Sequence, residues 1–315
     1  MLPTNRPAGS SAKRSKRFVT PKTALYLLAG LTALVYLQVL PYPAVYDDAH
    51  IAVLRWMTPL QAHFGVLLLH LLNGVLLWHL SRRWLSETAS VIVVLLFWLH
   101  PLQTEAVAYI SGGMETLLTT YMLVAVLAGL AGGWWLAVSA ASLWLAVTLK
   151  FSALPLLLIV PAIIAIESGK RVLWLLPVMA LGGATAFLAL PSIGGLGFGP
   201  HVLQVNLALW RYLAMIPIPY GFSIEHDWWS VPQSVGYAAL ILTLACGVAA
   251  FAVRSRWSAP LYAWLFIIGL LAPRALTLHG EPPCEVCLTE HHSLLPFTSI
   301  WLTLGSAWDR WYGLA

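Results

Sequence analysis

Long apolar stretches recur along the whole chain, and they constrain the fold more than any other feature of the sequence. A membrane-spanning helix needs about 20 mostly apolar residues, and several stretches approach that length. Hydrophobic residues make up 60% of the chain and charged residues only 9%, whereas a soluble domain carries about a quarter charged residues. The candidate helices are 23–40, 63–80, 89–107, 114–131, 134–149, 151–167, 172–190, 236–253, 258–275 and 294–308. The sequence therefore predicts an all-α, polytopic integral membrane protein with about ten transmembrane helices.

The net charge of +5 is distributed as a topology signal. A basic, Ser-rich segment, 1–22, precedes the first apolar stretch, and we expect it to be disordered and cytoplasmic. The remainder, 23–315, is expected to form one membrane domain. Counting spans from the cytoplasm puts four further basic regions on the same side, namely Arg82/Arg83, Lys170/Arg171, Arg254/Arg256 and Arg310. This agreement favours one orientation, and it argues against nucleic acid as a partner.

The opposite face then receives most of the polar residues that are capable of chemistry. It includes the long segment 191–235 and the loop 276–293. A helix-like run, 205–215, lies in the first of these and is followed by Pro217 and Pro219, which would stop it. We expect a short interfacial helix there, lying along the membrane surface.

Asp47 and Asp48 form an acidic pair in the first outer loop. Two carboxylates at the edge of a membrane can supply a general base or hold a divalent cation. The alternative is a solvated loop with two ordinary carboxylates. A divalent cation is thus a candidate cofactor, and the sequence indicates no further one.

Three polar residues share one face of the second predicted helix: His63, His70 and Asn73. Spacings of seven and three residues bring side chains to the same side of a helix. Polar groups inside a membrane helix are costly unless they are paired. Hydrogen bonding between helices is the preferred interpretation for His70 and Asn73, whereas His63, near the outer end, could face a substrate.

His100 and Glu105 flank a predicted break at Pro101, so both should lie near the aqueous boundary. They could bind substrate hydroxyls or merely cap the next helix. Lys150 lies between two apolar stretches at the outer face and is a good partner for a lipid phosphate. Arg211 is a second phosphate candidate. The alternative for both cations is simple extension toward the lipid headgroups.

Glu225 and His226, followed by Asp227, form a polar cluster in the long outer segment. The spacing matches no metal motif, so the cluster either lines a substrate cavity or belongs to a solvated loop.

Cys284 and Cys287 form a C-x-x-C motif ahead of Glu290 and His291. Cysteine and histidine are zinc ligands, but this spacing is not a common zinc signature. An oxidising compartment favours a local disulfide, with a structural metal second and redox catalysis third. A membrane thiol–disulfide oxidoreductase is therefore an alternative function.

Four segments, in order, resemble the membrane part of the transmembrane-and-TPR-containing O-mannosyltransferases and their bacterial relatives. They are Ala62–Asn73, Leu99–Gly112, Leu209–Leu213 with Pro219–Ser223, and Glu290–Pro296. The resemblance implies a GT-C glycosyltransferase fold and a polyprenyl-phosphate-linked sugar donor. It also implies that an acid of the first outer loop, Asp47 or Asp48, is catalytic. The chain departs from the family by lacking TPR repeats, and by Gly113 and Glu115 where the family has arginine and aspartate.

Together these features predict an inverting glycosyltransferase, with His63, His100, Glu105, Glu225, His226, Glu290 and His291 as substrate-binding candidates. The acceptor would be a hydroxyl of a protein, glycan or lipid. The expected location is a bacterial inner membrane, with the site facing the periplasm or exterior. A non-catalytic subunit for lipid-sugar transport or assembly is the other alternative, although the sequence has no evident inverted repeat.

Overall fold

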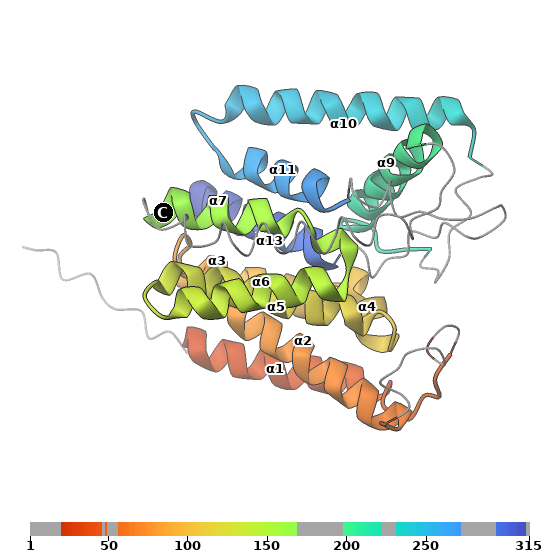
Figure 1. Ribbon diagram of the computed structural model, residues 1–315, viewed down its shortest axis with the longest axis vertical. Coiled ribbons are helices and arrows are strands. Elements are labelled where there is room, and N and C mark those ends of the chain that lie inside the picture. The colour runs from red at the N-terminus through yellow and green to blue at the C-terminus, as the bar shows by residue number, and fades with distance from the viewer. Residues whose placement is uncertain are drawn as a thin grey trace, which may run out of the picture.

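The computed structural model describes residues 20–45, 48, 56–168, 198–221, 231–271 and 294–312, and the regular secondary structure within them is entirely helical (Figure 1). The α-helices are α1 (Pro21–Leu37), α2 (Pro59–Ser81), α3 (Glu87–Leu99), α4 (Thr104–Ala108), α5 (Gly113–Ala131), α6 (Trp135–Leu149), α7 (Leu156–Ser168), α9 (Phe198–Met215), α10 (Gln233–Val253), α11 (Ala259–Leu271) and α13 (Leu294–Tyr312). Short 3-10 turns, η3 (Pro101–Gln103) and η4 (Phe151–Ala153), precede α4 and α7. The predicted helix 172–190 lies outside the described residues.

Several of these helices are long and apolar enough to cross a membrane. Within the described part of the chain, α2, α5 and α10 meet this condition, and α3 with 101–108 forms a bent pair that can count as a fourth span. The helices α1, α6, α7 and α11 are apolar but shorter. The chain is therefore a membrane protein whose described part is helical, and the expectation of about ten spans remains a prediction.

Local sequence explains where several helices begin and end. The start of α2 is a capping box, in which Thr58 Oγ1 accepts from the Gln61 N–H and Gln61 Oε1 accepts from the Thr58 N–H. Pro59 occupies the first turn, where its missing N–H costs no hydrogen bond. At the other extreme, α5 stops at Gly132, whose φ of 71° is a conformation that glycine adopts without strain.

The centre of the bundle is built from α2, α3, α5 and α13, with α1 and α10 at opposite edges (Figure 1). Fully buried aromatic side chains fill it, among them Phe97, Trp98 and Trp301. Farther out, α9 is attached to α10 through Trp210, whose Nε1–H donates to the Ala239 carbonyl and to Thr243 Oγ1 at 3.0 Å each. This packing leaves one long face of α10 exposed and apolar.

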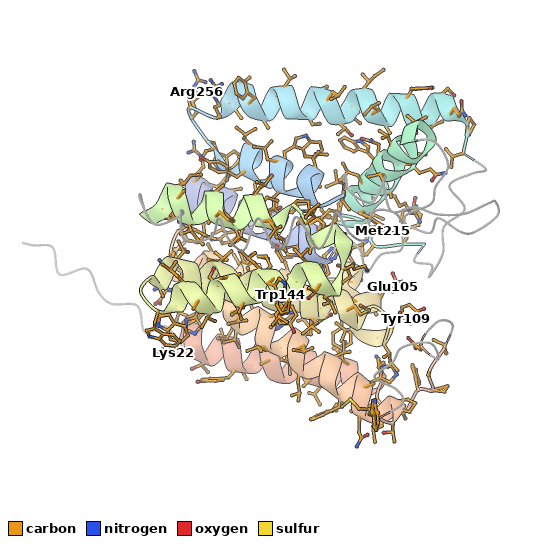
Figure 2. The ribbon with its side chains drawn as sticks, in the orientation of Figure 1. Lys22, Glu105, Tyr109, Trp144, Met215 and Arg256 are labelled. Atoms are coloured by element: carbon orange, nitrogen blue, oxygen red, sulfur yellow. The ribbon has the colours of Figure 1, made fainter. Side chains whose placement is uncertain are left out.

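The bundle has two chemically different ends. At one end, Asp309 of α13 accepts hydrogen bonds from Ser86, and the Arg310 guanidinium donates to the Arg256 carbonyl at 3.0 Å. Figure 2 shows Lys22 and Arg256 at this end, and Glu105, Tyr109 and Met215 toward the other. We call the first the basic end and the second the acidic-loop end, because the loop carrying Asp48 lies there.

Candidate functional site

Asp48 attaches the first loop to the body of the protein. Its side chain is fully buried, Oδ1 accepts from the Ser111 N–H at 2.8 Å, and Oδ2 accepts from the Val45 N–H at 3.0 Å. Its own N–H donates to the Val45 carbonyl at 3.0 Å, which closes a tight turn. The carboxylate thus fixes the loop against the junction between α4 and α5. Asp47 lies outside the described residues.

This junction, residues 109–115, needs small residues. A Cβ on Gly112 would lie 2.8 Å from the Glu105 carbonyl oxygen, and one on Gly113 would collide with Val66 of α2. Position 113 is therefore closed by α2 to any larger side chain. Glycines at 112 and 113 allow α4, α5 and α2 to meet closely.

Glu115 and Lys150 form an ion pair at the same end of the bundle. Lys150 Nζ lies 2.6 Å from Glu115 Oε1. The Glu115 side chain is 2% exposed and the Lys150 side chain 25% exposed. Glu115 also lies in the first turn of α5, where the helix dipole favours an anion. Because Ser111 and Glu115 are four positions apart, the junction links Asp48 to Lys150.

His100 stabilises the predicted break after α3, which the structure confirms as a bend of 52°. Its Nδ1 accepts from the Leu102 N–H at 3.2 Å, so the neutral ring carries its proton on Nε2, which lies 2.9 Å from the Ile216 carbonyl. His100 therefore joins the break to the end of α9. Glu105, one turn later, is half-buried at the acidic-loop end (Figure 2).

His63, His70 and Asn73 lie on one buried face of α2, as the spacing predicts. Trp98 Nε1–H donates to the His70 carbonyl at 3.0 Å, and the His70 ring lies 3.3 Å from the Trp98 carbonyl. Asn73 donates to the Thr116 carbonyl at 2.8 Å. The expected interhelical bonding of His70 and Asn73 is thus confirmed.

His63 differs from its two neighbours on this face. It is 3% exposed, and its ring interacts electrostatically with Asp48. The Tyr42 backbone approaches the ring, but within the described residues neither ring nitrogen has a hydrogen-bond partner of good geometry. His63 therefore lies within electrostatic range of the buried carboxylate of the first loop.

Arg211 of α9 holds the chain that follows this helix. Its guanidinium donates to the Gly221 carbonyl at 2.8 Å and to the Tyr220 carbonyl at 3.3 Å, and it lies 5.1 Å from the centre of the Tyr220 ring. Gly221 has a φ of 67°, which suits glycine. Arg211 thus positions the residues that directly follow the end of α9.

Sequence reasoning missed two features of this end. Glu115 was recognised as a departure from the family pattern but not as the partner of Lys150. Gln103 is fully buried in η3, and its amide has no hydrogen-bond partner among the described residues. Its position between His100 and Glu105 was the available signal.

The remaining predicted site residues lie outside the part of the chain that the structure describes. They are Glu225, His226, Cys284, Cys287, Glu290 and His291. Within the described residues, no three His, Cys, Asp or Glu side chains gather in a way that could hold a metal ion. A divalent cation and a disulfide therefore stay predictions.

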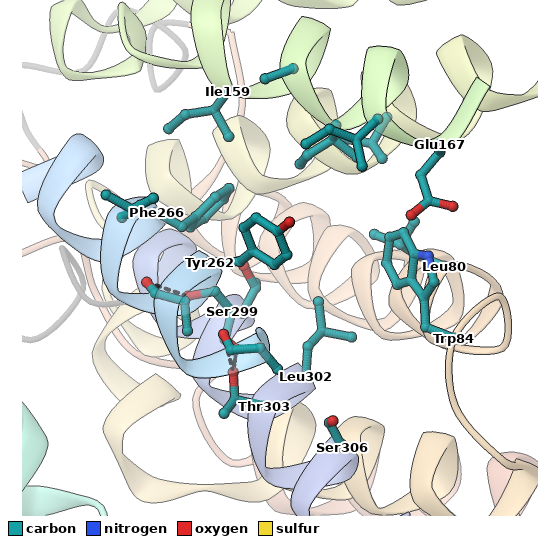
Figure 3. Close-up of a pocket in the computed structure, with 18 of the residues that line it drawn as sticks. Leu80, Trp84, Ile159, Glu167, Tyr262, Phe266, Ser299, Leu302, Thr303 and Ser306 are labelled. Carbon is teal, nitrogen blue, oxygen red and sulfur yellow. Dashed lines mark hydrogen bonds between the residues drawn. The ribbon is translucent and has the colours of Figure 1, made fainter. Parts of the chain in front are cut away.

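A large cavity lies in a different part of the molecule. It has a volume of about 650 Å³ and is lined by α2, α5, α7, α11 and α13 (Figure 3). Its lining includes Trp84, Ser258 and Ser306, which follow basic loops or lie near the C-terminal end of α13. The cavity is therefore associated with the basic end and not with Asp48.

No protein-family model matches the chain, and no curated protein and no solved structure matches it either. The function of the protein is therefore inferred from its own residues and fold.

Proposed function

We propose that this protein is a membrane glycosyltransferase that moves a sugar from a polyprenyl-phosphate carrier to a hydroxyl of a protein, glycan or lipid. One observation supports the proposal most directly. Asp48 accepts a hydrogen bond from Ser111 in the junction 109–115, and Glu115 of the same junction forms an ion pair with Lys150. An acidic loop and a cation are thereby held at one end of a membrane bundle. A lipid-phosphate sugar needs a cation for its phosphate and a base for the acceptor.

The donor's prenyl chain lies among the membrane helices, and its phosphate lies near Lys150 and Arg211. A lysine ammonium has three donors, so Lys150 can bind a carboxylate and a phosphate oxygen together. Its ion pair with Glu115 restricts the long side chain to one place, which lowers the entropy lost on binding.

The base takes the proton of the acceptor hydroxyl as its oxygen attacks the anomeric carbon. The bond between that carbon and the phosphate oxygen breaks, and polyprenyl phosphate leaves as an anion that nearby cations stabilise. One displacement inverts the anomeric centre. Because both Asp48 oxygens already accept backbone N–H groups, we assign the base to Asp47 and a positioning role to Asp48.

The proposed active face is the periplasmic or exterior face of a bacterial inner membrane. The support is the concentration of arginines at the opposite end, since basic loops are retained in the cytoplasm. His100, Glu105 and His63 would bind sugar or acceptor hydroxyls at the outer end, together with Glu225, His226, Glu290 and His291.

Separate Asp47→Asn and Asp48→Asn variants test the proposal. Purified protein in vesicles would be given polyprenyl-phosphate mannose or glucose, and release of polyprenyl phosphate would be measured. Asp47→Asn should lower the rate by roughly 10²-fold or more, as expected for loss of a general base. Asp48→Asn should lower both the rate and the melting temperature.

The matched control is Glu87→Gln, which removes an exposed carboxylate that pairs with Arg82 at the opposite end of the bundle. It should leave the rate unchanged. Full activity in the Asp47→Asn variant would remove the base assignment, and full activity in both aspartate variants would eliminate the mechanism.

A further inference from the structure

The cavity at the basic end is an apolar groove between five helices. Leucine, isoleucine, methionine and valine side chains of α2, α5 and α7 form one wall, and α11 and α13 form the other. Figure 3 shows Glu167 and Trp84 at one end of the groove and Ile159 and Phe266 toward the other. The groove thus has an apolar body and a polar end.

Part of the apolar lining of the groove lies at the surface of the bundle. Three of its apolar lining residues remain largely exposed: Leu158 by 67%, Ile166 by 65% and Leu265 by 58%. These residues belong to α7 and α11, two apolar helices of the membrane bundle. Exposed apolar side chains on membrane helices face lipid chains, so an occupant can enter the groove sideways from the bilayer.

Three arginines lie close in the sequence, or through a hydrogen bond, to residues at the polar end of the groove. Trp84, which lines the groove, follows Arg83 directly, and Ser258 lies two residues after Arg256. Arg310 donates to the Arg256 carbonyl, so it belongs to the same rim. Glu167 is the acidic residue of the lining. We infer a positive rim, because three arginines lie near this end of the groove and Glu167 is the charged residue of its lining.

We propose that the groove binds one anionic glycerophospholipid of the leaflet at the basic end. An acyl chain fills the apolar body, and the phosphate lies against the arginine rim. The volume of about 650 Å³ falls within the range of about 300–1,000 Å³ typical of small-molecule sites. A basic rim attracts anionic headgroups, and an apolar groove binds acyl chains.

This site is distinct from the proposed donor site. The donor's phosphate is assigned to Lys150 and Arg211, which lie at the other end of the bundle with Asp48. The lipid site therefore does not depend on glycosyl transfer, and it would stand if that activity were disproved.

Photo-crosslinking tests the occupant directly. A diazirine amino acid is placed at Ala162, an exposed lining residue of α7, and in a second protein at Val248, an exposed residue of α10 outside the groove. Full-length protein is reconstituted in vesicles of equal phosphatidylglycerol and phosphatidylcholine, with a minor amount of polyprenyl phosphate. Mass spectrometry of the intact protein then identifies each adduct.

Position 162 should capture phosphatidylglycerol in preference to phosphatidylcholine, whereas position 248 should follow the composition of the bilayer. Arg83→Gln or Arg256→Gln should each lower the preference at position 162 by roughly fivefold, which corresponds to about 1 kcal/mol per basic residue near a membrane. The same variants should not change adduct formation at position 248.

Three results would overturn the proposal. Equal lipid ratios at positions 162 and 248 would show only bulk membrane contact. A polyprenyl adduct at position 162 would assign the groove to a prenyl chain. A crosslink from position 162 to the protein's own segment 169–197 would show that protein fills the groove.

Discussion

Glu115 places a carboxylate inside an apolar helix, where an unpaired charge would be costly. Lys150 compensates it from the end of α6 at 2.6 Å. The sequence identified Lys150 as an outer cation because it stands alone between two apolar stretches. The pairing could not be predicted, since it joins residues 35 positions apart and depends on how α5 packs against α6.

The pair is testable by a double-mutant cycle. Glu115→Gln or Lys150→Met should each destabilise the protein, because each leaves a partly buried charge without its partner. We expect a loss of about 2–3 kcal/mol in the free energy of unfolding, at the low end for a buried pair since Lys150 is a quarter exposed.

The double variant should be less destabilised than the sum of the two single variants. Reversible unfolding of the protein in mixed detergent micelles measures the three values. Additive losses would mean that the two side chains do not interact in the folded protein, and Arg82→Gln, at an exposed ion pair, supplies the comparison.

The contact that Asp48 makes in the candidate site was likewise not predictable from the sequence. Asp47 and Asp48 were chosen as site candidates only because they lie in the first outer loop. The structure shows that Asp48 is buried and accepts a hydrogen bond from the Ser111 N–H, so this residue packs against the helices. That bond uses a backbone N–H of a residue 63 positions away. No pattern in the sequence identifies such a donor, because every residue except proline has one.

At the scale of elements, the sequence predicted helices best where the signals are local. The break after α3 followed from Pro101, and the start of α13 at Leu294 and the end of α5 at Ala131 agree with the predicted ranges. The prediction began α2 at residue 63, four residues late, because Pro59 within the first turn was not recognised as a starting residue. The predicted interfacial helix also began late, since α9 starts at Phe198.

Two glycines of α2 offer a matched test of how this helix packs. Gly74 lies directly against the Trp98 indole, whereas a Cβ on Gly65 would meet nothing within 4 Å. Gly74→Ala should destabilise the protein by about 1–3 kcal/mol, since Trp98 is fully buried and hydrogen-bonded to His70 and so has little room to move.

Gly65→Ala should be neutral or slightly stabilising, because alanine has the higher helix propensity. The melting temperature of each variant in detergent provides the measurement. A Gly74→Ala protein as stable as the Gly65→Ala protein would contradict the close contact between α2 and α3.

At the scale of the whole molecule, the division into a basic end and an acidic-loop end connects the topology signals of the sequence with the chemistry. Arginines of separate loops gather through contacts such as Arg310 with Arg256. Asp48, His100 and Lys150 lie toward the other end. Both proposals, glycosyl transfer at one end and lipid binding at the other, depend on this division.

The orientation of the two ends in the membrane can be measured with single cysteines. Trp56, in the chain just before α2 at the acidic-loop end, is 87% exposed, and Trp311, at the end of α13 near the arginines, is 85% exposed. In a background where Cys246, Cys284 and Cys287 are serine, a membrane-impermeant maleimide added to intact cells should label Trp56→Cys. It should label Trp311→Cys only after the membrane is permeabilised, since basic loops stay in the cytoplasm.

The two positions are a fair comparison because their side chains are almost equally exposed. Labelling in the opposite order would place Asp48 and Lys150 in the cytoplasm and remove the basis for periplasmic sugar transfer.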